Sequence, residues 1–93
     1  MNRIIILGMT KEGSKFRPSD WAERLYYALA SYDHNRRIVF NPMVNLKQTD
    51  KYKCFVINPK LEKSEPMTYD FLVDFVRTNN LEVTDQDHNP VEF

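Results

Sequence analysis

The sequence contains few of the residues on which most catalytic and metal sites depend. Among 93 residues there are one cysteine, two histidines and two glycines. The single cysteine, Cys54, cannot form an internal disulfide or a zinc site by itself. Gly8 and Gly13 are too few for a glycine-rich phosphate loop. His34 and His88 fall in a turn and a tail, where no partner is expected to hold a catalytic base. We therefore expect no enzymatic activity, no cofactor and no metal site.

Long hydrophobic segments are also absent. The apolar run at residues 3–7 is shorter than a signal peptide, and a polar loop follows it. No other stretch approaches the roughly 20 apolar residues of a membrane-spanning helix. Because 93 residues with 42% hydrophobic content fit one small globular domain, we expect a soluble cytoplasmic domain with no membrane partner.

The net charge is zero, but the charges are unevenly distributed along the chain. Residues 1–60 contain 11 basic and 5 acidic side chains, a net charge of +6, whereas residues 61–93 contain 2 basic and 8 acidic side chains, a net charge of −6. Folding could mix the two parts so that their charges compensate internally. Alternatively, the fold keeps a basic and an acidic face, which would favour an anionic partner or head-to-tail association.

The first half of the sequence predicts a strand followed by a helix. The apolar run at residues 3–9 has strand length and no alternation, which is typical of a central strand buried on both faces. A helix is expected from about Ser19 to Tyr32. Ser19 or Asp20 would be its N-cap, and Asp20 with Glu23 has the spacing of a capping box.

Two further strands are expected in the middle of the chain. The second covers residues 38–46 and is interrupted at Asn41-Pro42. Because proline has no N–H to donate, this strand should be bent or lie at the edge of the sheet. A turn at residues 48–51 leads into a third strand at 52–57.

A second helix and a final short strand complete the predicted domain. The helix begins near Glu65-Pro66, because proline suits the first helical turn. It ends at Asn79-Asn80, since asparagine tolerates the left-handed conformation that terminates helices. Its core face would consist of Phe71, Leu72, Phe75 and Val76. Residues 81–83 read as the last strand of a domain that spans 1–84, and residues 85–93 as a flexible polar tail.

This order of elements predicts an α+β fold. A two-layer sandwich of the β-α-β-β-α-β ferredoxin-like type has the same order, with two helices on one face of an antiparallel sheet. A less regular antiparallel sheet with two helices on one face is the alternative, because the second strand is weak. The opposite face of the sheet would be either solvated or a binding surface.

Several segments together match the hallmark of a known family. They are Gly8-Met9-Thr10, Gly13 and Phe16-Arg17-Pro18-Ser19-Asp20-Trp21-Ala22-Glu23-Arg24-Leu25. This combination resembles a family of small proteobacterial proteins classed as a domain of unknown function. Matches at 58–62 and 66–72 extend the resemblance to about Val83. The resemblance implies a stand-alone bacterial domain of this size with an α/β sandwich, and it carries over no catalytic residue.

The first helix has more aromatic residues than one core-facing stripe can hold. That stripe would consist of Trp21, Ala22, Leu25, Ala28, Leu29 and Tyr32. Tyr26 and Tyr27 cannot both lie on the same face, so at least one should be exposed beside Arg24, a composition typical of recognition surfaces. Together with the missing catalytic groups, this favours a non-enzymatic interaction or regulatory module that binds a protein partner or itself.

Two other functions are considered. A regulatory domain could bind a small anionic ligand through Lys15, Arg17, Arg24 and the start of the first helix, whose N–H groups attract anions. Nucleic-acid binding is a weaker alternative. RNA-recognition modules share the expected strand order, but they stack bases on aromatic residues of the central strands. Here Tyr52 and Phe55 point to opposite faces of one strand, so a nucleic-acid partner is not favoured.

Trp21, the only tryptophan, is expected to be buried and structural. It falls in the first turn of the first helix, directly after the loop that contains Phe16. A large side chain at a helix entry can pin the preceding loop, as a hydrophobic staple does. We therefore expect Phe16 or Pro18 among its contacts.

Overall fold

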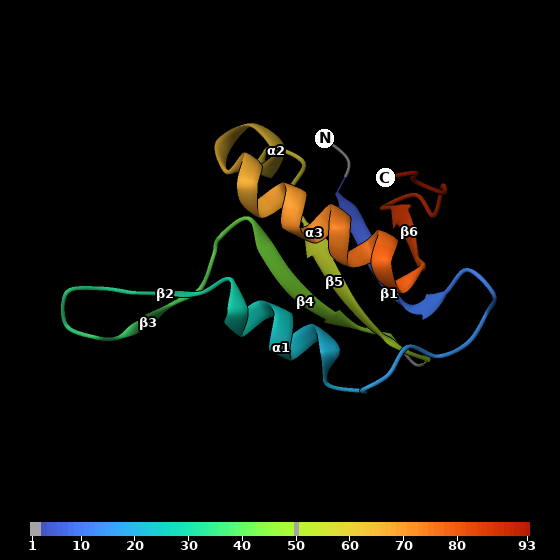
Figure 1. Ribbon diagram of the computed structural model, residues 1–93, viewed down its shortest axis with the longest axis horizontal. Coiled ribbons are helices and arrows are strands. Elements are labelled where there is room, and N and C mark those ends of the chain that lie inside the picture. Colours follow the sequence, from blue (N-terminus) through green and yellow to red (C-terminus); the bar gives the residue numbers. More distant parts are fainter. Residues whose placement is uncertain (1–2, 50) are drawn as a thin grey trace.

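A four-stranded antiparallel sheet is the centre of the fold. The computed structural model describes residues 3–49 and 51–93. The sheet consists of β1 (Ile4–Thr10), β4 (Val44–Gln48), β5 (Lys53–Ile57) and β6 (Leu81–Asp85), in the order β4-β5-β1-β6 (Figure 1). Every neighbouring pair is antiparallel. The turn predicted at 48–51 joins β4 to β5, and its Asp50 lies outside the described residues.

The β-branched strand β1 is internal, as its sequence predicts. Ile6 faces the helices and is fully buried, whereas Ile5 and Leu7 face the other way and are only half-buried. The expected burial on both faces is therefore wrong, because the helices cover only one side of the sheet (Figure 1). Strand β4, which follows Pro42, lies at the sheet edge as predicted.

Two longer helices and one short helix form the second layer. Helix α1 (Trp21–Ala28) and helix α3 (Pro66–Asn79) lie on the same face of the sheet (Figure 1). The short helix α2 (Leu61–Ser64), which the sequence pattern did not reveal, precedes α3. Pro66 starts α3, and Asn80 ends it in the left-handed conformation with φ of 53°, both as predicted. Within the described residues no helix is long and apolar enough to cross a membrane.

The predicted capping box of α1 does not form. Asp20 is the N-cap residue, but its side chain makes no capping hydrogen bond. Instead, its carboxylate accepts a hydrogen bond of 2.9 Å from Nε of Arg24. Glu23 pairs with Lys53 on β5. Both carboxylates have cationic partners, and charge-assisted bonds are stronger than neutral ones.

Helix α1 ends at Ala28, earlier than predicted, and a separate hairpin follows. This hairpin pairs β2 (Ser31–Tyr32) with β3 (Ile38–Val39) and projects from the body of the molecule (Figure 1). Oδ1 of Asp33 accepts the backbone N–H groups of Asn35 and Arg37 at 2.8 and 2.9 Å, which stabilises the turn. The strand predicted at 38–46 is therefore two strands in two different sheets.

The observed order of elements corrects the predicted one. It reads β1-α1-β2-β3-β4-β5-α2-α3-β6, so the hairpin and α2 interrupt the simple β-α-β-β-α-β order. The coarser expectation, an α+β fold with an antiparallel sheet and helices, is confirmed. The hairpin was missed because strands of two residues are too short to show a period.

The hydrophobic core lies between the sheet and the helices. Its fully buried side chains include Ile6, Phe55, Ile57, Leu61, Leu72 and Leu81. Trp21 is only 4% exposed. Its ring packs edge-to-face on Phe16, with centroids 5.6 Å apart, and parallel to Phe75 at 6.1 Å. The prediction that Trp21 is buried against Phe16 is confirmed.

Residues 85–93, predicted as a flexible polar tail, fold back on the domain. The N–H of Val91 donates to the carbonyl of Val83 at 2.9 Å. The ring of Phe93 contacts Tyr69 edge-to-face, and its carbonyl accepts a hydrogen bond of 2.9 Å from Nε of Arg77. Packing thus continues past the boundary expected at residue 84.

Candidate functional site

The hairpin at residues 31–39, which we call the arm, exposes apolar side chains. Tyr32 is 72% exposed, and its cross-strand partner Ile38 and the adjacent Val39 are also exposed. Tyr32 was predicted to lie on the core face of α1, which is wrong because the helix ends before it. A two-stranded hairpin is marginally stable by itself in water. The arm therefore combines exposed apolar side chains with low intrinsic stability.

Aromatic residues at the base of the arm attach it to α1. Tyr26 stacks on Phe40, with ring centroids 4.6 Å apart, and Tyr27 meets Phe40 edge-on at 5.2 Å. Tyr27 remains 59% exposed, whereas Tyr26 is half-buried. The expectation that at least one of the two tyrosines is exposed is confirmed. The exposed ring of Tyr27 extends the apolar surface of the arm onto the helix.

The outer side of α3 has a second exposed apolar surface, which we call the α3 ridge. It consists of Met67, Asp70, Phe71 and Asp74, which follow the spacing of one helical face. Met67 is 85% exposed, and Phe71 is also exposed. The prediction that Phe71 lies on the core face is wrong, because the buried Leu72 and Val76 turn the opposite side of α3 to the sheet.

The arm and the α3 ridge carry opposite charges. Arg36 and Arg37 lie at the exposed turn of the arm, and Asp70 and Asp74 lie on the α3 ridge. Within residues 3–49 and 51–93, none of these four side chains forms an ion pair. Only one ion pair there, between Lys11 and Glu92, joins the basic and the acidic parts of the sequence. The charge asymmetry of the sequence is thus present at the surface.

The structure does not bring the three predicted anion-binding residues together. Arg24 is paired with Asp20, and this hydrogen bond lowers the pKa of the Asp20 carboxyl below its usual value. Arg17 is exposed on the loop before α1. Lys15 lines a small hollow, and its neighbours there are Lys51 and Lys53 rather than the two arginines. Sequence reasoning missed both lysines, because they belong to a distant segment.

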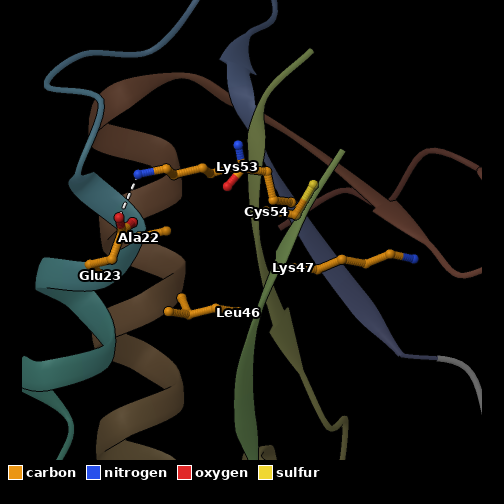
Figure 2. Close-up of a pocket in the computed structure, with 7 residues that line it drawn as sticks. Ala22, Glu23, Leu46, Lys47, Lys53 and Cys54 are labelled. Carbon is orange, nitrogen blue, oxygen red and sulfur yellow. Dashed lines mark hydrogen bonds and ion pairs between the residues drawn. The ribbon is translucent and has the colours of Figure 1, made fainter. Parts of the chain in front are cut away.

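A larger hollow of about 300 Å³ lies between α1 and the strands β4 and β5 (Figure 2). Figure 2 shows Lys53 reaching across to Glu23 on α1, while Lys47 points away from the helix. Cys54 also lines this hollow but is buried, and burial raises the pKa of its thiol. A thiol with a raised pKa is a poor nucleophile.

The exposed residues of the arm had one local signal in the sequence. Asp33 and Asn35 form a turn-like pair, and Tyr32 and Ile38 flank it with side chains that favour strands. The helical spacing of Tyr32 concealed this signal. Met67 and Phe71 had no comparable signal, because an exposed apolar residue on a helix looks like part of its core face.

Comparisons with known proteins identify relatives but assign no activity. A family model described as a protein of unknown function, DUF3579, matches residues 1–86. A solution structure described as the first structural representative of its protein family has 29% sequence identity and a TM-score of 0.90. The match covers 99% of this chain and 85% of that one. No curated protein matches the chain. The expected resemblance to a domain of unknown function is confirmed.

Proposed function

The chain belongs to the DUF3579 family, whose function is unknown, and we propose that it is a non-enzymatic module that associates with protein through its arm. The observation that carries this proposal is the exposed apolar surface of the projecting hairpin. Tyr32, Ile38 and Val39 face solvent on two strands of two residues each. Covering these side chains would remove apolar area from water and stabilise a hairpin that is weak by itself.

The partner that best fits the arm is a second copy of this chain. The arm combines apolar side chains with Arg36 and Arg37, and the α3 ridge combines Met67 and Phe71 with two aspartates. Arm against arm would bring like charges together, and so would ridge against ridge. Contact between the arm and the α3 ridge pairs opposite charges and apolar surfaces, which favours this arrangement of two copies. If the contact is reciprocal, two copies close a symmetric dimer.

Sedimentation velocity over a concentration series at low and high salt tests this proposal. The wild type should sediment faster at higher concentration, and less so at high salt because salt screens charge pairs. The variants Arg36→Asp/Arg37→Asp and Asp70→Arg/Asp74→Arg should each be monomeric. An equimolar mixture of the two should associate again, because each then meets an oppositely charged surface.

A matched control changes the same amount of charge elsewhere. Lys47→Asp/Lys60→Asp alters exposed lysines outside the arm and the α3 ridge, so its association should equal that of the wild type within a factor of two. A wild type that stays monomeric at every concentration and salt would exclude a second copy as the partner. Failure of the variant mixture to associate would exclude contact between the arm and the α3 ridge.

Four observations support a function without catalysis or nucleic acid. Glu23 is engaged with Lys53, and the thiol of Cys54 is buried. His34 and His88 are both exposed on turns. Phe55, which would have to stack on bases in an RNA-recognition module, is fully buried.

We also propose that the main sheet keeps the ferredoxin-like arrangement, with the arm and α2 as additions to it. The order β4-β5-β1-β6, with α1 and α3 on one face, supports this when the strands of the arm are left out. A cytoplasmic location is likewise a proposal. The unpaired thiol of Cys54 supports it, since reduced cysteines are typical of that compartment.

A further inference from the structure

A small hollow at the end of the sheet, which we call the lysine pocket, gathers positive charge from two separate segments. Its volume is about 150 Å³, and Lys15, Lys51 and Lys53 line it together with Ser19. No acidic side chain lines it among residues 3–49 and 51–93. Asp50, next to Lys51 in the sequence, lies outside the described residues. The described lining is therefore cationic and polar at one end of the molecule.

The side chain of Trp21 brings an N–H group to the same pocket. Trp21 lines the pocket and is 4% exposed, yet its indole N–H has no hydrogen-bond partner within the described residues. The indole nitrogen lies over Gly8, which also lines the pocket. A Cβ atom at Gly8 would come within 3.1 Å of it. This N–H group can donate a hydrogen bond to an acceptor that enters the pocket.

The close contact at Gly8 explains why a glycine stands there. A Cβ atom would lie 2.8 Å from the backbone oxygen of Lys53, which cannot move without displacing β5. The glycine lets the indole approach the strand and keeps space above it. Gly8 is thus both a strand residue and part of the floor of the pocket.

The start of α1 adds to the positive potential. Ser19 and Trp21 at this helix end line the pocket. Because the Asp20 carboxylate is turned to Arg24, no side chain caps the first N–H groups of the helix. Uncapped N–H groups at a helix start favour negative charge nearby.

We propose that the lysine pocket binds a small oxyanion, namely phosphate or the phosphoryl group of a small metabolite. A doubly charged phosphoryl group matches three lysines better than a singly charged carboxylate does. Lysine binds phosphate as a point charge. Pockets for drug-sized ligands measure about 300–1,000 Å³. At about 150 Å³ this one holds the phosphoryl group and little else, so a nucleotide base has no room inside it.

The ion pair of Lys53 with Glu23 does not prevent this binding. An ammonium group has three N–H donors, and Glu23 takes one of them from the side of α1 (Figure 2). The remaining donors of Lys53 are free to meet an oxyanion. Glu23 thereby positions Lys53 at the boundary between the larger hollow and the lysine pocket.

Titration of the full chain with inorganic phosphate, followed by NMR, tests the proposal. The total ionic strength is held constant with sodium chloride, so that screening does not change. The indole N–H resonance of Trp21 should shift saturably, because this donor gains an acceptor. Lys15→Ala/Lys51→Ala should weaken binding by tenfold or more, whereas Lys47→Ala/Lys63→Ala, outside the pocket, should leave it within twofold of the wild type.

Separate titrations distinguish free phosphate from the phosphoryl group of a small metabolite. Inorganic phosphate, glycerol phosphate and acetate are compared at equal concentration, and the two phosphorylated probes should bind more tightly than acetate. Equal affinities for all three, an indole resonance that does not move, or equal weakening by both double variants would each overturn the proposal. The result does not depend on whether the arm associates with a second copy.

Discussion

Lys53 on β5 forms an ion pair with Glu23 on α1, and this contact joins the first helix to the central sheet (Figure 2). Both side chains are partly shielded from solvent. The second carboxylate oxygen of Glu23 is buried and has no hydrogen-bond partner within the described residues. Glu23 therefore depends on Lys53 to offset the cost of placing a charge at this position.

Removing Lys53 alone should be more harmful than removing both members of the pair. Lys53→Met should lower the free energy of unfolding by about 1–3 kcal/mol, because Glu23 is left without its partner. The double variant Lys53→Met/Glu23→Leu should recover part of this loss. Urea denaturation of the full double-mutant cycle measures the difference. If the effects of the two single changes are additive, the interaction energy between Lys53 and Glu23 is zero.

Trp21→Ala should destabilise the protein strongly. The side chain is buried between Phe16 and Phe75, and truncating a buried aromatic residue typically costs ~3–5 kcal/mol. Trp21→Phe, which keeps a ring, should cost less. The denaturant midpoint measures both, with Tyr27→Ala as an exposed aromatic control. Equal midpoints for Trp21→Ala and Tyr27→Ala would contradict the structure.

Gly8→Ala should destabilise the protein through a direct clash. The added methyl group would meet the backbone oxygen of Lys53 at 2.8 Å, and overpacking of this kind costs about 1–3 kcal/mol. The change should also alter the fluorescence of Trp21, whose indole nitrogen lies beside the new methyl group. At Gly13 a methyl group meets no atom, but φ of 91° disfavours any side chain. Gly13→Ala should therefore destabilise the protein without changing the fluorescence.

Acidification should loosen the turn that begins the C-terminal segment. Hydrogen bonds from the backbone N–H groups of Asn89 and Asp87 lower the pKa of Asp85 below its ordinary value of 3.8. The charged carboxylate therefore stabilises the folded turn above that value, and the contribution is lost as the pH falls through the lowered pKa. The protection factor of the Val91 N–H, which is corrected for the pH dependence of intrinsic exchange, should decrease in this range. Asp85→Asn should remove the pH dependence, and an unchanged profile in this variant would contradict the assignment.

Tyr32→Ser should separate the role of the arm from the stability of the domain. Tyr32 is exposed and lies outside the core, so the free energy of unfolding should change by no more than about 0.5 kcal/mol. Association measured by sedimentation should nevertheless decrease at least fivefold. A large loss of stability with unchanged association would show instead that Tyr32 stabilises the fold and does not contribute to association.

The elements that the sequence predicted well are those with a strong local cause. Strand β1 has a run of three isoleucines, and α3 begins at Pro66 and is terminated by Asn80. The burial of Trp21 followed from its place at a helix start. In each case neighbouring residues alone determine the outcome, so no knowledge of the rest of the chain was needed.

The elements that failed depend on contacts between distant segments. The apolar spacing of α1 continues to Tyr32, but the chain leaves the helix after Ala28 to form the arm. Lys15 lines the same pocket as Lys51 and Lys53 because a bridge to Met9 places it beside β1. Strand β1 in turn pairs with β5 in a register that sets Leu7 opposite Cys54. No pattern of residue spacing in the sequence predicts that register. Arg24, one of the predicted contact residues, pairs instead with the local partner Asp20.

The pairing of β1 with β6 has a consequence for the synthesis of the protein. Ile4, at the beginning of the chain, is opposite Asp85, near its end. On the ribosome, β1 can pair with β5 on one side but keeps an open apolar edge on the other until residues 81–85 emerge. Open edges of this kind recruit other strands. The nascent chain therefore exposes this apolar edge until β6 has emerged and paired with β1, and chaperone binding during that interval would protect it from aggregation.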